Sequence, residues 1–186
     1  MTHVTIVASP TASVASEVDL TWRDESACAA TATALAQALR AGLEGGASMV
    51  IELHGTLGAG KTTFTRHLLR ALGVQGRIKS PSYAVVEPHE LPGHTVHHFD
   101  FYRFNDPQEW EDAGFRDLFA APGLKLVEWP DKAAGLLPTP DLRLHLAVPD
   151  ETRREVKLEA LSPEGRAALS AVIPSSPAAE GGPVHA

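Results

Sequence analysis

The sequence predicts an α/β fold with a largely parallel central sheet, flanking helices and a late antiparallel strand pair. Short apolar segments with strand character alternate with segments of helical periodicity, which is the order expected when helices connect parallel strands. A glycine-rich stretch links one of these strands to an amphipathic helix. The chain has 186 residues, of which 44% are hydrophobic, so it suits one domain with a buried core.

The first half of the chain contains two clear helices around one apolar strand. A helix is expected over about 25–42, capped by Asp24, because apolar residues recur there at helical spacing. An apolar strand is expected over 48–53, and a second helix over 61–72 that ends at Gly73. The expected buried stripe of the first helix consists of Cys28, Thr31, Leu35 and Leu39.

The second half contains mostly strands. Asp106, Pro107 and Glu109 form a strong helix start, with a cap, a proline at the first position and a capping-box acid. Ser162 opens a final short helix. The expected strands are 83–87, 95–100 and 124–128, followed by the late pair 141–148 and 153–160.

Composition limits the organisation and location of the chain. We expect a loose arm over 1–16, one domain over 17–173 and a disordered tail over 174–186. No secretory signal or membrane-spanning run is visible, and the single cysteine, Cys28, cannot form an intramolecular disulfide, so a cytoplasmic location is expected. The net charge of −7 disfavours direct binding to nucleic acid.

The glycine-rich stretch matches the phosphate-loop pattern Gly-x₄-Gly-Lys-Thr over 55–62. Glycines let backbone N–H groups approach a phosphate, and the following helix presents its positive end to the anion. Lys61 supplies a cation to the β- and γ-phosphates, and the hydroxyl of Thr62 suits Mg²⁺. The sequence therefore predicts the fold of a P-loop nucleoside triphosphatase that binds ATP with Mg²⁺. The predicted nucleotide-binding residues in the loop are Gly58, Ala59, Gly60, Lys61, Thr62 and Thr63.

Two acids are candidates for a second magnesium anchor. Asp100 and Glu128 each end an apolar strand, and ligands bind at the carboxyl edge of an α/β sheet. We therefore predict that they hold the metal with Thr62 and act in catalysis with Lys61. Each is equally explained, taken alone, as a solvated strand end. The nearby histidines His89, His94, His97 and His98 match no zinc pattern, and a structural or surface role is expected for them.

Three classes of nucleotide-binding protein remain to be compared. A GTPase would need an Asn-Lys-x-Asp guanine motif, which the sequence lacks. A small-molecule kinase would need a basic lid, whereas the stretch 105–112 is acidic. The third class is an ATPase that serves a partner protein. No arginine finger is evident, and Arg103 is either a catalytic cation or a salt-bridge partner for the Asp100 strand.

Five blocks of the sequence, in matching order and spacing, closely resemble the TsaE family. They are 55–66 (GTLGAGKTTFTR), 79–83 (KSPSY), 86–88 (VEP), 98–103 (HFDFYR) and 126–130 (LVEWP). The resemblance implies a P-loop ATPase needed to form N6-threonylcarbamoyladenosine at position 37 of tRNA. It implies partners of the TsaD and TsaB type, contact with tRNA only through that complex, and weak hydrolysis by the isolated chain.

The resemblance also assigns roles to residues outside the loop. Asp100 and Glu128 match acids implicated in magnesium binding and hydrolysis, and Trp129 matches an aromatic beside the nucleotide, although core packing explains it as well. Ser80 and Ser82 match a switch-like loop that usually reads Ser-Pro-Thr. Thr56 departs from the family, which usually has an acid there, and no adenine contact is carried over.

Overall fold

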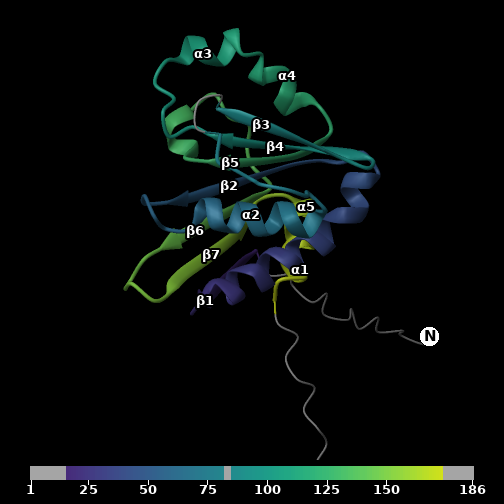
Figure 1. Cartoon of the computed structure of the whole chain (residues 1–186). Coiled ribbons are helices and arrows are strands. Elements are labelled where there is room, and N and C mark those ends of the chain that lie inside the picture. The colour runs from purple at the N-terminus through teal and green to yellow at the C-terminus, as the bar shows by residue number, and fades with distance from the viewer. Residues whose placement is uncertain (1–15, 82–84, 174–186) are drawn as a thin grey trace, which may run out of the picture.

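The computed structural model describes residues 16–81 and 85–173 of the chain. They form one seven-stranded sheet in the order β1-β7-β6-β2-β5-β4-β3, with helices on both faces (Figure 1). The strands are β1 Glu17–Trp22, β2 Ser48–Gly55, β3 Val86–Leu91, β4 His94–Asp100, β5 Gly123–Glu128, β6 Leu142–Ala147 and β7 Arg154–Ala160. The helices are α1 Glu25–Glu44, α2 Lys61–Leu72, α3 Pro107–Asp112, α4 Phe115–Ala120 and α5 Pro163–Ser170, with a 3₁₀ helix η1 at Pro130–Ala133.

The sheet is mixed, which corrects the prediction of a largely parallel one. Strands β6, β2, β5 and β4 run parallel, but β3, β7 and β1 pair antiparallel with their neighbours. The physical reason is the length of the connections: two residues join β3 to β4 and six join β6 to β7, and neither is long enough for a crossover. The predicted late antiparallel pair is present as β6 and β7.

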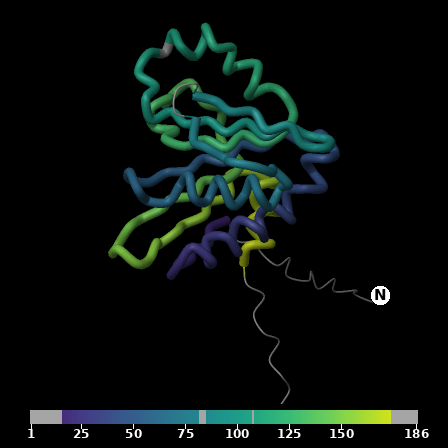
Figure 2. Tube along the Cα trace, in the orientation of Figure 1, coloured from purple at the N-terminus to yellow at the C-terminus, as the bar shows by residue number. Residues whose placement is uncertain are grey.

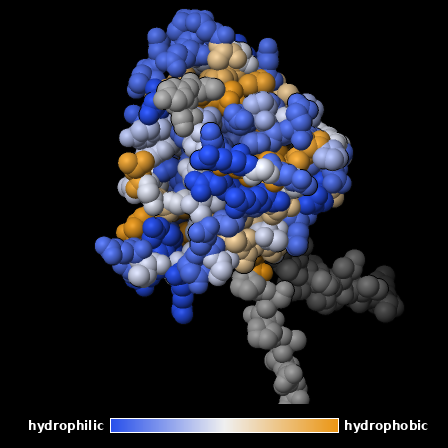
Figure 3. Space-filling view, in the orientation of Figure 1, coloured by the Kyte–Doolittle hydropathy of each residue, from blue (hydrophilic) through white to orange (hydrophobic). Residues whose placement is uncertain are grey.

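Two hydrophobic cores lie on opposite faces of the sheet. Helices α1, α2 and α5 cover one face, where Leu35 and Phe64 belong to the same buried core as Leu124 and Leu126 of β5. The short helices α3 and α4 cover β3, β4 and β5 on the other face, where the buried residues are mainly aromatic. Figure 2 shows the α3–α4 segment at one end of the molecule and the β6–β7 hairpin at the opposite end. The face in Figure 3 is mostly hydrophilic, with small separate apolar patches.

Most predicted elements are present with small shifts. Helix α2 has the predicted bounds, α1 extends two residues further, and the Asp24 side chain caps α1 by accepting from the N–H of Ala27. All four residues of the predicted stripe on α1 are buried. Helix α3 begins after Asp106 and α5 after Ser162, as predicted. Strand β3 starts at Val86, and residues 83 and 84 of the strand expected over 83–87 lie outside the described part of the chain.

Three elements were not predicted: β1, α4 and the 3₁₀ helix η1. Strand β1 alternates exposed and partly buried residues and pairs with β7. Its period of two could have predicted a strand there. Helix α4 has only six residues and follows α3 after Ala113 and Gly114, which makes it too short for periodicity to reveal. The predicted tail at 174–186 and all but the last residue of the predicted arm at 1–16 lie outside the described residues, and both stay predictions. No helix in the described part of the chain is long and apolar enough to cross a membrane.

Gly123 offers a test of the packing at the start of β5. Its φ is +108°, and a Cβ there would overlap the carbonyl oxygen of Thr95 on β4, whereas Gly46, at φ +86°, has open space around the same position. We expect Gly46→Ala to lower the free energy of unfolding by about 1–2 kcal/mol through backbone strain alone. Gly123→Ala adds an overpacking cost and should lower it by about 2–5 kcal/mol. Urea unfolding followed by tryptophan fluorescence gives both values, and equal losses would contradict the close approach.

Candidate functional site

The candidate site lies where the parallel strands β2, β4 and β5 end. Because parallel strands bring their carboxyl ends to the same edge of a sheet, Gly55, Asp100 and Glu128 meet there. A pocket of about 210 Å³ occupies this edge. Its lining consists of Leu57, Gly58, Ala59, Gly60, Lys61, Thr62, Thr63, Asp100, Glu128 and Trp129. The structure thus brings all the predicted loop residues together with both predicted acids and Trp129.

The loop between β2 and α2 is shaped by its glycines. A Cβ on Gly55 would lie 2.6 Å from the carbonyl oxygen of Leu146 on β6, and its φ of +147° also favours glycine. Gly60 precedes α2 with a φ of +108°, and no side chain in the described part of the chain caps the helix. The first N–H groups of α2 therefore face the loop without a side-chain partner, which is the arrangement that attracts an anion.

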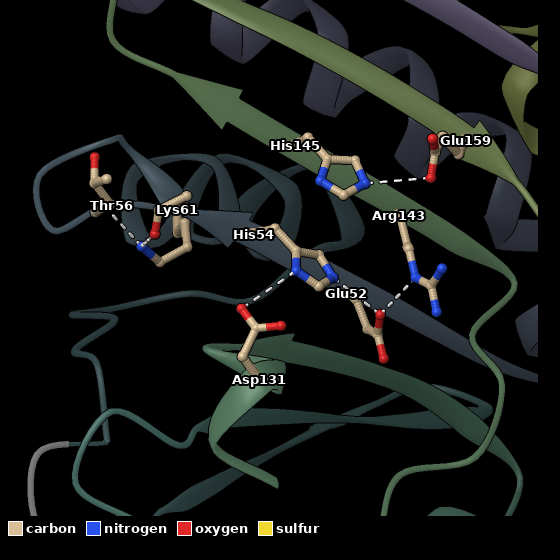
Figure 4. Close-up of polar contacts among 9 residues, drawn as sticks. Glu52, His54, Thr56, Lys61, Asp131, Arg143, His145 and Glu159 are labelled. Atoms are coloured by element: carbon tan, nitrogen blue, oxygen red, sulfur yellow. Dashed lines mark hydrogen bonds and ion pairs between the residues drawn. The ribbon is translucent and has the colours of Figure 1, made fainter. Parts of the chain in front are cut away.

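Lys61 is buried at the centre of the loop, with 4% of its surface exposed. Its ammonium group donates to the carbonyl oxygens of Gly55 at 2.6 Å and of Thr56 at 2.9 Å (Figure 4). It also lies 3.7 Å from the centre of the Trp129 ring. Burial lowers the pKa of Lys61, while the charges of Glu128 and Asp100 oppose that shift. An ammonium has three N–H donors, so one remains for a ligand in the pocket.

Glu128 is a fully buried carboxylate that connects three elements. Its Oε2 accepts a hydrogen bond from the hydroxyl of Thr62 on α2 at 2.8 Å. Its Oε1 lies 2.8 Å from Nε2 of His98 on β4. Only 1% of Glu128 is exposed, so it is not a solvated strand end. His98, expected to be structural or on the surface, is buried beside a predicted site residue.

Asp100 lies at the rim of the pocket, directly opposite Glu128 in the sheet register. Its Oδ2 accepts from the hydroxyl of Ser80 at 2.5 Å, and its Oδ1 accepts from the backbone N–H of Tyr102 at 3.0 Å. Arg103 lines a neighbouring pocket that also contains Asp100 and Ser80. Ser80 of the predicted switch-like loop is thus joined to the site, while Ser82 lies outside the described residues.

Trp129 has a strained backbone. Its φ of +58° is in the left-handed region, which is unusual for a bulky residue and concentrates at functional sites. The ring is half-buried, packs 5.0 Å from the ring of Tyr102 and covers the ammonium group of Lys61. Trp129 therefore contributes both to the pocket and to the edge of the aromatic core.

A second pocket, of about 240 Å³, lies on the other side of the same loop. It shares Gly58, Ala59, Gly60 and Thr63 with the first pocket and is otherwise lined by Trp22, Asp24, Glu25, Cys28, Glu151, Thr152 and Arg154. The guanidinium of Arg154 donates to the carbonyl oxygen of Ala59 at 3.2 Å. Burial raises the pKa of the Cys28 thiol to about 12, so the thiol stays neutral. Sequence reasoning missed this lining because β1, α1 and the β6–β7 connection are distant in the chain.

A polar network next to the loop was also missed (Figure 4). Glu52 on β2 is held by His54 at 3.0 Å and by Arg143 of β6 at 2.9 Å. Burial alone would raise the pKa of Glu52, but the hydrogen bonds from His54 and Arg143 lower it overall. His54 also stacks on His145 and lies 3.7 Å from Asp131 of η1. The network therefore ties the strand before the loop to β6 and to the turn after Trp129.

The fold and the site define an α/β protein built around a glycine-rich strand–loop–helix, with two carboxylates on neighbouring strands. The sequence model of the TsaE family, described as threonylcarbamoyl adenosine biosynthesis protein TsaE, matches residues 22–156. The chain belongs to the TsaE family, whose members take part in threonylcarbamoyladenosine biosynthesis, and the resemblance noted in the sequence is confirmed.

Individual relatives agree with this assignment. The tRNA threonylcarbamoyladenosine biosynthesis protein TsaE of Haemophilus influenzae is 40% identical over 124 residues, which cover 67% of this chain and 78% of the relative. The protein of the same name from Bacillus subtilis is 33% identical over 112 residues, 60% of this chain and 70% of the relative. The crystal structure of Bacillus subtilis YdiB has the same fold, with a TM-score of 0.65 at 24% identity, over 84% of this chain and 93% of that one.

Proposed function

We propose that this protein is a Mg²⁺-dependent ATPase with a P-loop fold that supports the formation of N6-threonylcarbamoyladenosine in tRNA. The observation that carries the proposal is the placement of Lys61, Thr62, Glu128 and Asp100 around one pocket at an uncapped helix start. Membership of the TsaE family supplies the pathway. The pocket contains the cation, hydroxyl and carboxylate groups that a nucleoside triphosphate with Mg²⁺ would need.

The loop residues provide a phosphate site that is already shaped. The N–H groups of Gly60, Lys61 and Thr62 lie at the start of α2, where the helix dipole favours an anion. Two donors of the Lys61 ammonium are held by loop carbonyls, which leaves the third for a phosphate. A phosphate bound there needs little rearrangement of the chain.

The residues beside the phosphate site fit Mg²⁺. No group of three or more His, Cys, Asp or Glu side chains among the described residues could hold a metal alone. Mg²⁺ is instead commonly held by one or two carboxylates together with phosphate oxygens and water. Thr62, Glu128 and Asp100 would hold it here through oxygen atoms, and the ion would neutralise charge on the phosphates.

The second pocket is the proposed place for the base and sugar of the nucleotide. It begins at the same loop residues and continues between β1, α1 and the segment around Arg154. Its rim is polar, with Asp24, Glu25 and Thr152, and its inner wall includes Trp22 and Cys28. A nucleotide placed this way would cross the loop at Gly58 and Ala59.

Hydrolysis requires that an attacking water be oriented and that developing charge be stabilised. Asp100 is the proposed group for the water, because Ser80 and the N–H of Tyr102 fix its carboxylate at the pocket rim. Among the described residues, Lys61 is the one cation that lines the pocket. The isolated chain should therefore hydrolyse ATP slowly, and we propose that partners of the TsaD and TsaB type complete the site.

Lys61→Ala tests nucleotide binding. Loss of a hydrogen-bonded cation beside phosphate should weaken ATP affinity about 10- to 150-fold, since one charged hydrogen bond contributes roughly 1.5–3 kcal/mol. Arg66→Ala, which removes an exposed cation from the same helix, is the matched control and should leave affinity unchanged. Calorimetry measures both. Unaltered affinity in the Lys61 variant would rule out the proposed phosphate site.

Asp100→Asn and Glu128→Gln test the two acids. Each keeps side-chain volume but removes a negative charge, and Mg²⁺-dependent ATP hydrolysis should fall at least tenfold, about 1.4 kcal/mol in barrier. Asp131→Asn, which changes an exposed acid just beyond β5, serves as the control. Steady-state hydrolysis assays with and without Mg²⁺ give the comparison. A variant with wild-type activity would remove that acid from the proposed machinery.

Reconstitution separates an ATPase that serves partners from a small-molecule kinase. In a mixture of TsaD- and TsaB-type proteins, tRNA, ATP and threonylcarbamoyl-adenylate, omission of this chain should leave at most one round of tRNA modification. The chain alone should transfer no phosphate to nucleosides or sugars. Repeated turnover without the chain would contradict the role in modification, and phosphate transfer to an acceptor would favour the kinase.

A further inference from the structure

His98 is a buried polar residue in contact with Glu128 of the proposed metal site, and the proposed function gives it no role. It is on β4, two residues before Asp100, with no exposed surface. In the register of β4 against β5, His98 lies opposite Leu126 while Asp100 lies opposite Glu128. Residues two apart on a strand share a face, so His98 and Asp100 both project on the side where Glu128 and α2 lie.

The polar contact of His98 is directed at one partner. Nε2 lies 2.8 Å from Oε1 of Glu128, and since a carboxylate oxygen only accepts, Nε2 must carry the donated proton. Nδ1 is buried and has no hydrogen-bond partner among the described residues. Burying an imidazole with one nitrogen unsatisfied is costly, and a leucine would fill the core without that cost. What a histidine provides at this position, and a leucine would not, is the hydrogen bond to Glu128.

That hydrogen bond determines the direction in which the Glu128 carboxylate points. A carboxylate at the end of a strand has several rotamers, and only some direct an oxygen toward Thr62. Because His98 holds Oε1, Oε2 faces the pocket and accepts the hydrogen bond from the Thr62 hydroxyl at 2.8 Å. Partners that orient a metal ligand in this way typically change metal affinity or activity by about 10- to 100-fold when they are removed.

We propose that His98 is a positioning residue for the magnesium site, which orients the Glu128 carboxylate toward Thr62 and the pocket. The proposal rests on the proposed function, because it assumes that Mg²⁺ and a nucleotide bind there. It concerns the hydrogen bond to Glu128 and not the packing of the ring. A side chain that keeps the donor should therefore keep the function.

The chain offers a matched control one residue away. His97 is also buried, with 8% exposed, but it projects to the opposite face of β4 toward Lys125 and Phe99. Substitutions at His97 and His98 therefore change the same residue type on the same strand with similar burial. Only those at His98 alter a contact with Glu128.

The test compares His98→Leu, His98→Gln and His97→Leu in the full chain. For each variant we would measure the Mg²⁺ concentration that half-saturates binding of a fluorescent ATP analogue. The Mg²⁺ concentration that half-saturates ATP hydrolysis is measured separately. The affinity for the nucleotide in EDTA is the metal-free reference. His98→Leu should raise that Mg²⁺ concentration at least about tenfold while metal-free affinity changes less than about twofold. His98→Gln, which retains an N–H donor, and His97→Leu should stay within about threefold of the wild type.

The alternative outcomes are distinct. If the wild-type protein binds no nucleotide in a Mg²⁺-dependent way, the proposed function fails. If the wild type binds nucleotide in a Mg²⁺-dependent way and His98→Leu has the same Mg²⁺ dependence, the positioning role is wrong while the proposed function stands. The same conclusion follows if the Mg²⁺ concentration needed for half-saturation rises as much in His98→Gln or His97→Leu as in His98→Leu. Thermal unfolding without ligand checks the fold, and His98→Met replaces the leucine variant should that one unfold.

Discussion

The architecture of the site depends on one buried carboxylate. Glu128 ends β5, an inner strand between β2 and β4, with 1% of its surface exposed, and an isolated charge in that position would be strongly destabilising. It is stabilised by Thr62 from α2 and by His98 from β4, each at 2.8 Å. These two contacts join the helix after the loop, the strand that carries Asp100 and the strand that ends just before Trp129. The relative positions of the other groups in the pocket follow from this junction.

The mixed sheet serves the same arrangement. The four parallel strands in the middle place the ends of β2, β4 and β5 at one edge, which hairpins alone could not do because antiparallel neighbours point in opposite directions. The antiparallel strands lie outside this centre. Strands β6 and β7 extend the sheet toward β1, and Arg154 at the start of β7 reaches back to the carbonyl of Ala59 in the loop. The parallel centre therefore forms the first pocket, and the antiparallel edge forms much of the wall of the second.

Local signals explain what the sequence predicted. The glycine loop with its helix, the caps at Asp24, Asp106 and Ser162, and the late strand pair are all specified within a few residues, and all are present. Of the described residues that line the first pocket, only Leu57 was not among the predicted site residues, and it lies within the predicted loop 55–62. The contacts that were not predicted join distant segments, such as His98 with Glu128 and Ala59 with Arg154. Neither periodicity nor a capping residue predicts such pairs, because they depend on the order of the strands in the sheet.

The same distinction applies to Lys61, whose role the motif predicts but whose environment it does not. Its ammonium group is buried, and burial disfavours the charged form, so the acids Glu128 and Asp100 are what keep a cation favourable there. Two loop carbonyls and the Trp129 ring hold the ammonium group in place before any ligand arrives. Under the proposed function, a metal drawn to those acids would withdraw negative charge from Lys61, and phosphate oxygens would replace it. Metal and nucleotide would then bind better together than separately, because each restores the charge balance that the other disturbs.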